Sequence, residues 1–317
     1  MRNCRLWSLA LMVLTAGSVT AGGFADRKVV WQGVDNVRDL GGMMTTNGLA
    51  VRAGLVYRSQ AFNDNAVSSR LSEDDGLIWS ITNDMLRLEY GTENADELLR
   101  RMDTNDLVRS CERVCAKLLA DREWWRPGKT RLTEESRRQI LETTGMKTEI
   151  DLRYDSECWS MTGSPLGPSV NWVHIPSRML GDINSATGRV AFARAFRLFL
   201  DEKNYPIVFH CIAGADRTGG LAFVLESLLG VTEEEMVHDY VLTSESSSGP
   251  RTEGRLRRMM RAFDPFPGGT IHERVHAYVR SCGFSDDDID VFRRIMLGDR
   301  KRNFRPSAVS PCTEVAR

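Results

Sequence analysis

The sequence lacks any appreciable net charge: 42 lysine and arginine residues stand against 43 aspartate and glutamate residues, for a formal net charge of −1 at pH 7. This balance provides no broad field that would attract nucleic acid or an anionic membrane, so any charge recognition must be local. Internal repeats and low-complexity tracts are also absent. With 317 residues, 42% of them hydrophobic, the chain can form one large domain or two ordinary ones with a buried core.

Long apolar runs are missing after the N-terminus, so the sequence predicts no later membrane span. The N-terminus itself carries Arg2 and Arg5, an apolar run over residues 6–19, and a small-residue pattern that ends at Ala21. We interpret residues 1–21 as a signal peptide, which implies export to the periplasm or full secretion. The alternative is an uncleaved anchor helix, but the run is short for a span of about 20 residues and a Gly-Ser pair interrupts it.

The cysteine spacings match no zinc ribbon or zinc finger. Six cysteines remain after signal cleavage: Cys111, Cys115, Cys158, Cys211, Cys282 and Cys312. The first two lie one helical turn apart in a segment that we expect to be helical, so a bond between them would constrain little. Disulfides persist outside the cytoplasm, but if Cys211 must stay free, at least one of the other five is unpaired too.

Helical and strand patterns alternate along the chain, which predicts an α/β fold with a central, mostly parallel sheet flanked by helices. The expected strands include a pair around Gly54 in residues 49–59, and residues 171–176 and 206–209. The expected helices include one between the N-cap Thr133 and Gly145, one over 188–200, one over 218–229 closed by Gly230, and one that begins at a Thr232–Glu235 capping box. Residues 22–300 form the predicted domain, with a helical insertion at about 62–130 and a tail at 301–317.

The strongest motif is "HCIAGADRTGG", which places a thiol between an apolar strand and an apolar helix. An ordinary thiol is mostly protonated at neutral pH, so a nucleophilic cysteine needs surroundings that favour the thiolate. Backbone N–H groups of Ile212–Arg217, the positive end of the following helix and the Arg217 guanidinium can supply them. The same groups would bind a phosphate dianion above Cys211, which predicts attack on phosphorus and a cysteinyl-phosphate intermediate.

Other residues of this motif have predicted supporting roles. Gly214 lets the backbone curl, the Thr218 hydroxyl can donate to the sulfur, and His210 orders the loop by hydrogen bonding. No metal or cofactor is required, because the thiolate and the loop dipoles provide what a metal would. The predicted phosphate-binding loop consists of Ile212, Ala213, Gly214, Ala215, Asp216, Arg217 and Thr218.

The motif resembles the signature loop of cysteine-dependent phosphatases, and "NVRDLGG", "VYRS", "EIDLR" and "DYVLT" are similar to the secreted bacterial tyrosine phosphatases. The resemblance runs from about Trp31 to Leu297, interrupted by the insertion. It implies a protein tyrosine phosphatase with Cys211 as the nucleophile, Arg217 as the phosphate ligand and Asp216 as the acid that protonates the leaving group. Its substrate would be a phosphotyrosine protein or a small phosphomonoester.

Asp39 and Asp151 are the alternatives for the acid. We interpret both as structural carboxylates that hold turns or pair with Arg38 and Arg153. Members of the family often carry lysine where this chain has Ala215, and that charge is associated with phosphoinositides. Its absence favours phosphotyrosine over an exported cysteine phytase or phosphoinositide phosphatase. An alternative of another class is a catalytically weak phosphate-binding module, against which the intact Cys211 and Arg217 argue.

A second motif, "HERVH" at residues 272–276, matches the H-E-x-x-H pattern of zinc proteases. The pattern is short and lacks the extension that carries a third histidine. The segment fits equally an amphipathic helix whose residues Ile271, Val275 and Val279 face the core. We favour the helix, without a metal.

Overall fold

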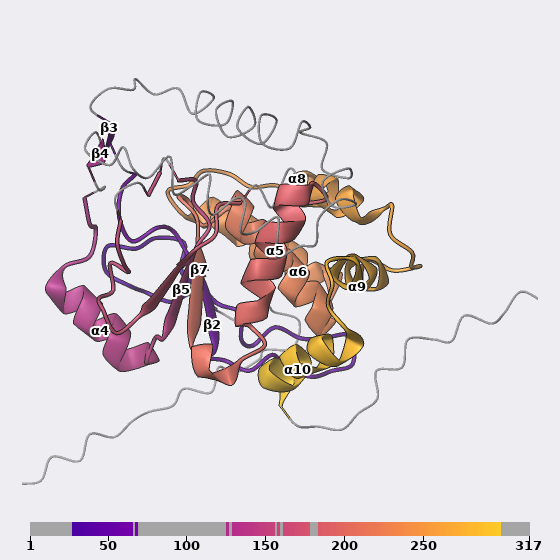
Figure 1. The fold of residues 1–317 in the computed structure, drawn as a ribbon. Helices are drawn as coiled ribbons and strands as arrows, with labels where there is room; N and C mark the ends of the chain where they lie inside the picture. Colours follow the sequence, from indigo (N-terminus) through magenta and orange to yellow (C-terminus); the bar gives the residue numbers. More distant parts are fainter. Residues whose placement is uncertain are drawn as a thin grey trace, which may run out of the picture.

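A five-stranded sheet forms the centre of the protein in this computed structural model (Figure 1). The structure describes residues 27–65, 67–68, 125–126, 129–155, 157–158, 161–177 and 183–298. The strands of the sheet are β1 (Arg38–Asp39), β2 (Val56–Ser59), β5 (Thr148–Asp151), β6 (Asn171–His174) and β7 (Ile207–His210). Their spatial order is β1-β2-β7-β5-β6, and β1 alone of these five runs antiparallel to its neighbour. The predicted mostly parallel α/β sheet is confirmed. Separately, β3 (Val67–Ser68) pairs with β4 (Trp125–Arg126).

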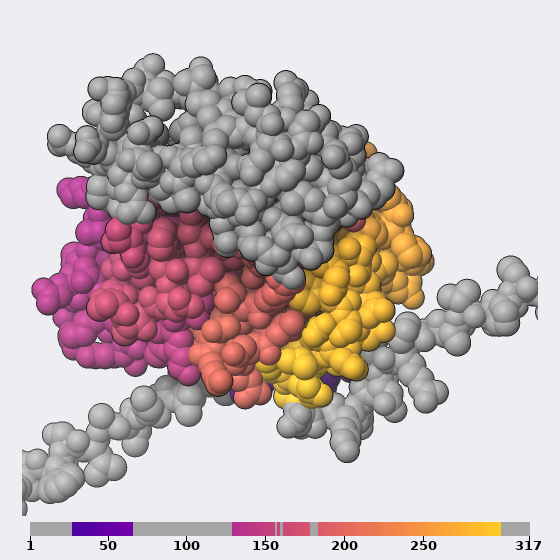
Figure 2. All heavy atoms as spheres, viewed as in Figure 1, coloured from indigo at the N-terminus to yellow at the C-terminus, as the bar shows by residue number. Residues whose placement is uncertain are grey.

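Helices cover both faces of the sheet (Figure 1). They are α4 (Glu134–Thr144), α5 (Ala186–Leu198), α6 (Asp216–Leu229), α7 (Glu233–Leu242), α8 (Glu253–Met260), α9 (Ile271–Ser281) and α10 (Asp286–Leu297). Short 3₁₀ turns follow at Glu202–Asn204, Thr243–Glu245 and Arg261–Phe263. In the space-filling view, α4 and α10 lie at opposite sides of the visible face, with residues of α5 between them (Figure 2).

Strand residues alternate between two hydrophobic clusters, as the two-residue period of a strand requires. On β7, Val208 packs into the cluster that includes Ile140 of α4, whereas Ile207 and Phe209 pack into the larger cluster with α5, α6, α9 and α10. All three side chains are fully buried. Each contributes about 1.5–3 kcal/mol through burial, and a parallel strand covered on both faces must be apolar throughout. This packing fixes β7, which carries the cysteine motif at its end.

Local signals set the helix ends as predicted. The Thr133 side chain accepts a hydrogen bond from Ser136 N at the start of α4, and Gly145 ends that helix at φ +63°. Gly230, at φ +74°, ends α6 in the same left-handed conformation. Of the capping box predicted at the start of α7, one half forms: the Thr232 side chain accepts from the backbone N–H of Glu235, whereas the Thr232 N–H donates to Met44 O. Helix α6 begins at Asp216, two residues before the predicted start.

The predicted pair of strands around Gly54 is wrong in its first half. Only Val56–Ser59 forms a strand, whereas Ala50 makes an isolated bridge with Met44 and the chain then turns at Gly54, where φ is +80°. All four residues of β2 are buried, and the strand takes its partners from β1 and β7 instead of from the preceding segment.

Several predictions fall on residues that the structure does not describe. These are the signal peptide at 1–21, the tail at 301–317 and most of the insertion at 62–130. Within the described ranges, no helix combines the length and the hydropathy that a membrane span needs.

Candidate active site

The cysteine loop lies between β7 and α6, at the carboxyl edge of the parallel strands, where α/β sheets bind their ligands. Cys211 follows the last strand residue and is 3% exposed. Gly214 has φ +65°, and a Cβ atom there would lie 2.4 Å from the carbonyl oxygen of Ser59 at the end of β2. Only glycine fits this position, so the tight curl of the loop is fixed by its contact with the neighbouring strand.

Every backbone carbonyl from Cys211 to Ala215 accepts a hydrogen bond from a residue outside this five-residue segment. The donors and distances are His210 Nδ1 to Cys211 O at 3.3 Å, Ala61 N to Ile212 O at 3.1 Å, Asn36 Nδ2 and Ser248 Oγ to Ala213 O at 2.9 Å each, and Arg58 to Gly214 O at 2.9 Å and to Ala215 O at 3.4 Å. Among the described residues, the backbone N–H groups of Ile212–Arg217 have no acceptor. Five tied carbonyls with free N–H groups are what an anion nest requires.

Arg58 connects the loop to a buried cluster of charges around Asp239. Arg27, Arg38 and Arg58 all pair with the Asp239 carboxylate, and all four side chains are at most 2% exposed. Burial alone would raise the pKa of Asp239, but the three guanidinium groups hold it well below its ordinary value. Of the three arginines, Arg58 is the one that also donates to carbonyls of the loop.

Arg217 is held in place by residues that follow β5. Its guanidinium donates to both carboxylate oxygens of Glu157, at 2.6 and 3.0 Å, and lies 4.4 Å from the ring centre of Tyr154. Burial would lower the pKa of Arg217, but Glu157 and the neighbouring Cys211 raise it, so the group stays charged. Its side chain is 15% exposed, so a permanent positive charge is held near the thiol, where it attracts an anion.

The carboxylate of Asp216 points towards α7 and α8. It accepts a hydrogen bond from the Tyr240 hydroxyl at 3.1 Å and pairs with Arg251 and Arg255, each at 3.0 Å. Burial and the neighbouring Asp216 raise the pKa of Tyr240 to about 12, so its hydroxyl remains a donor. Asp216 is 30% exposed and adjacent to Arg217, and its carboxylate oxygens accept from Tyr240, Arg251 and Arg255 in this structure.

The two alternative acids have structural contacts. Asp39 accepts hydrogen bonds from Gly41 N at 2.7 Å and Gly54 N at 2.6 Å, while its burial raises its pKa. Asp151 is fully buried and binds Arg153 as predicted. Burial alone would raise the pKa of Asp151, but His210 and Arg153 hold it well below its ordinary value.

Asp39 holds a turn as predicted, but the alternative, a pair with Arg38, is wrong. Arg38 pairs with Asp239, about 200 residues later, and also donates to Asn36 and Thr243. Successive residues of a strand point to opposite faces, so the side chains of Arg38 and Asp39 on β1 diverge.

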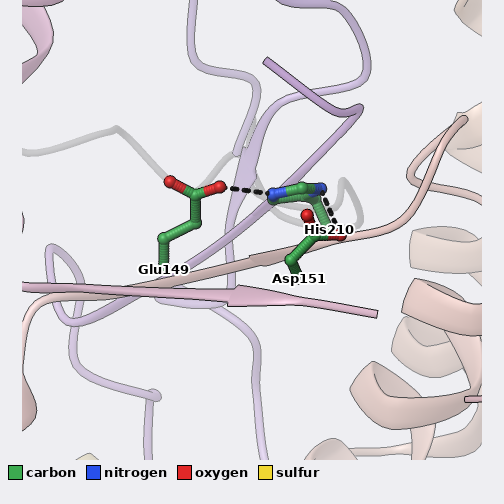
Figure 3. A group of neighbouring side chains, drawn as sticks. All are labelled: Glu149, Asp151 and His210. Atoms are coloured by element: carbon green, nitrogen blue, oxygen red, sulfur yellow. Dashed lines mark hydrogen bonds and ion pairs between the residues drawn. The ribbon is translucent and has the colours of Figure 1, made fainter. Parts of the chain in front are cut away.

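Three buried titratable side chains lie close together beneath the loop: Glu149 and Asp151 on β5 and His210 at the end of β7 (Figure 3). His210 Nε2 is 2.9 Å from Glu149 Oε1, and Nδ1 is 3.8 Å from Asp151 as well as facing the Cys211 carbonyl. The ligand atoms lie within 4.8 Å of one another, close enough to hold a metal ion. However, Arg153 already binds both Asp151 oxygens at 2.6–3.1 Å, so a cation there would face a guanidinium. We interpret the group as a network that supports the loop.

The remaining motif residues have these positions. The Thr218 hydroxyl is buried without a hydrogen-bond partner among the described residues, so the expected bond to the sulfur is not made here. The "HERVH" segment lies on α9, and the predicted core residues Ile271, Val275 and Val279 are buried. Its two imidazoles have separate partners: His272 Nε2 contacts Val231 O at 2.8 Å and His276 Nε2 contacts Asp286 at 3.2 Å.

The described cysteines other than Cys211 are enclosed by the protein, and Cys158 Sγ lies 3.1 Å from His174 Nε2 and 3.4 Å from Tyr154 O. Cys158 and Cys282 are free and buried, as is Cys211. Burial raises the pKa of Cys158 well above its ordinary value and that of Cys282 to about 11. Buried protonated thiols are poor nucleophiles. Cys111, Cys115 and Cys312 lie outside the described residues.

The parallel sheet ends in a loop that carries a cysteine and, after five residues, an arginine. The N–H groups of this loop are arranged to bind an anion next to the thiol, which is the arrangement of a class of proteins that bring a thiol to an anionic ligand. The tyrosine phosphatase family model matches residues 29–72 and 119–298, which is more than half of the chain. The chain therefore belongs to the tyrosine phosphatase family. The unmatched residues 73–118 fall inside the predicted insertion.

A curated protein is also similar in sequence. A tyrosine-protein phosphatase from Nostoc commune is 30% identical over 90 residues, which are 28% of this chain and 31% of that protein. The match therefore spans about a third of the length of that relative.

Sequence reasoning missed the residues that hold the site from a distance, namely Arg58, Glu157, Asp239, Asn36, Ser248 and Arg251. Arg58 lies in "VYRS" and Asp239 in "DYVLT", two stretches that carried the resemblance, so that resemblance was the available signal for them. Glu157 lies in an irregular segment after β5, and no local pattern marks it.

Proposed function

We propose that the protein is a cysteine-dependent phosphatase that hydrolyses phosphotyrosine through a cysteinyl-phosphate intermediate. The observation that carries the proposal is the loop itself. Its carbonyls from Cys211 to Ala215 accept hydrogen bonds, its N–H groups find no acceptor in the part of the chain that the structure describes, and Arg217 lies beside the thiol. Such preorganised donors stabilise the charge that develops on a transferring phosphoryl group. Membership of the tyrosine phosphatase family supports the same reaction.

In the first step the Cys211 thiolate attacks phosphorus, a sulfur–phosphorus bond forms, and the bond from phosphorus to the phenolic oxygen breaks. The phenolate takes a proton, which we assign to Asp216. In the second step water attacks the phosphocysteine, Asp216 accepts a proton from that water, and Cys211 leaves as the thiolate with release of phosphate. Because Asp216 is ion-paired in this structure, it must become protonated before the first step. Asp151 is fully buried and Asp39 is held by the backbone N–H groups of Gly41 and Gly54, which supports the choice of Asp216 over them.

The test is hydrolysis of a phosphotyrosine peptide in reducing buffer with EDTA, by the native chain and by Cys211→Ser. We expect phosphate release by the native chain and none above background by the variant, which should still bind the peptide. Cys158→Ser is the matched control, because this thiol is buried and protonated. Full activity of Cys211→Ser would contradict the proposal that Cys211 is the nucleophile. Activity on inositol hexakisphosphate or phosphoinositide alone would favour the phytase or lipid alternative.

Export remains part of the proposal. It rests on residues 1–21, and its test is N-terminal sequencing of the chain after expression in a bacterium with a periplasm. A mature N-terminus after Ala21 is the expected result, and recovery of the uncleaved chain from the membrane would favour the anchor.

A further inference from the structure

Two arginines beside the loop share a single carboxylate. Arg251 Nε and Nη2 lie 3.0 and 3.1 Å from the two oxygens of Asp216, and Arg255 Nη2 lies 3.0 Å from the second oxygen. Two positive charges against one negative charge leave one positive charge uncompensated at this position. Asp216 directly precedes Arg217 in the chain, so this excess charge lies beside the phosphate-binding loop.

The two arginines differ in access. Arg251 is 12% exposed and also donates to the carbonyls of Ser248, Gly249 and Pro250, so it holds its own segment against the loop. Arg255 projects from α8 with 43% of its side chain exposed and makes no other ion pair within the described part of the chain. It is therefore the one that can turn to an incoming anion.

Helix α8 extends the positive surface away from the loop. Arg258 on α8 and Arg261, directly after its end, follow Arg255 at three-residue intervals. Both are exposed and have no carboxylate partner among the described residues. The opposite side of the helix is buried through Leu256 and Met259. The three exposed arginines, Arg255, Arg258 and Arg261, span about 9 Å along the chain axis. This length matches two or three residues of an extended peptide better than a single phosphoinositide headgroup.

We propose that Arg255, with Arg251 behind it, forms a subsite for an acidic residue within about two positions of the phosphotyrosine, so that the preferred substrates are acidic phosphopeptides. The inference rests on the proposed function and specifies its substrate class. The carboxylate of Asp216 shows the kind of group that the two guanidiniums hold, and a substrate carboxylate would pair with Arg255 through the same planar fork.

The test compares two phosphotyrosine peptides that differ only in having glutamate or glutamine at the two flanking positions on each side. For the native chain we expect kcat/KM to favour the acidic peptide by about two- to fivefold for each glutamate engaged, as exposed ion pairs allow. The preference should fall as salt is raised from 50 to 500 mM. In Arg255→Gln the ratio between the two peptides should approach one. The ratio within each variant is the readout, so any change in basal turnover cancels.

Arg257→Gln is the matched control, because Arg257 lies on the same helix, is 54% exposed and pairs with Glu253 instead of Asp216. It should keep the native ratio. Equal hydrolysis of both peptides by the native chain would overturn the subsite and leave the phosphatase proposal standing, whereas no hydrolysis of either would overturn the phosphatase proposal itself. Loss of inositol hexakisphosphate hydrolysis in Arg255→Gln, with an unchanged peptide ratio, would show a polyphosphate subsite instead and also overturn the inference.

Discussion

Replacing Arg58 by glutamine should separate the support of the loop from the stability of the fold. Arg58 is 1% exposed, pairs with Asp239, and donates to Gly214 O at 2.9 Å and to Ala215 O at 3.4 Å. Arg27 is the control, since it pairs with the same carboxylate and is equally buried, but contacts no loop atom. Arg58→Gln and Arg27→Gln each remove one of the three guanidinium groups around Asp239. Only Arg58→Gln also removes hydrogen bonds to the loop.

The magnitude follows from the shorter of the two loop contacts. A hydrogen bond to a charged group contributes about 1.5–3 kcal/mol, and about 1.4 kcal/mol corresponds to a tenfold change in rate. If that contact orients the loop donors in the transition state, kcat should fall by about 10- to 150-fold in Arg58→Gln. Breaking a buried ion pair costs about 3–5 kcal/mol in general. The loss here should be at the lower end, and similar for the two variants, because two arginines still surround Asp239.

The assay is steady-state hydrolysis of p-nitrophenyl phosphate together with urea unfolding of each variant. We expect similar losses in the free energy of unfolding for Arg58→Gln and Arg27→Gln, with kcat reduced mainly in the former. A folded Arg58→Gln protein with native kcat would refute the role of the tied carbonyls. Equal losses of kcat in both variants would show that the charge cluster matters only for overall stability.

Three further predictions concern the groups around the loop. Glu157→Gln removes the charge and one of the two oxygens that hold Arg217. We therefore expect kcat/KM to fall by about tenfold and inorganic phosphate to inhibit more weakly. Unchanged inhibition by phosphate would contradict the role of Glu157 in positioning Arg217. Asp216→Asn should slow hydrolysis of a phosphotyrosine peptide by about 10²-fold or more but affect p-nitrophenyl phosphate less, since nitrophenolate leaves without a proton; equal losses would remove Asp216 from the acid role. The pKa values of Asp151 and Asp239 are lower in the folded state than in the unfolded chain, so their contribution to stability is present above about pH 4 and is lost as pH falls further. Urea unfolding between pH 2 and pH 6 should show this decline, and a flat profile below pH 4 would be inconsistent with it.

The parts of the site that the sequence predicted are those with local signals. The strand, the cysteine loop and α6 lie within 25 consecutive residues, and their order places Cys211 and Arg217 in one loop whatever the rest of the chain does. The helix ends at Gly145 and Gly230 were predictable for the same reason, because left-handed conformations select glycine.

The supporting contacts could not be predicted in this way, because they join residues far apart in the sequence. Glu157 reaches Arg217 across 60 positions, and Arg58 reaches Gly214 across 156. Alternation of side chains also misled the prediction near Gly54, since a strand pattern does not say which strand will be its neighbour. The direction of the Asp216 carboxylate depends on α8, whose position follows only from the packing of the helices.

The central claim is that Cys211 becomes covalently phosphorylated during turnover. It is tested most directly by mixing the native chain with excess phosphotyrosine peptide, quenching within milliseconds in denaturant, and locating the added phosphate by mass spectrometry of peptides. The account predicts phosphate on the peptide that carries Cys211, formed before free phosphate is released and absent in Cys211→Ser. Rapid release of phosphate with no covalent adduct, or an adduct on another residue, would contradict it.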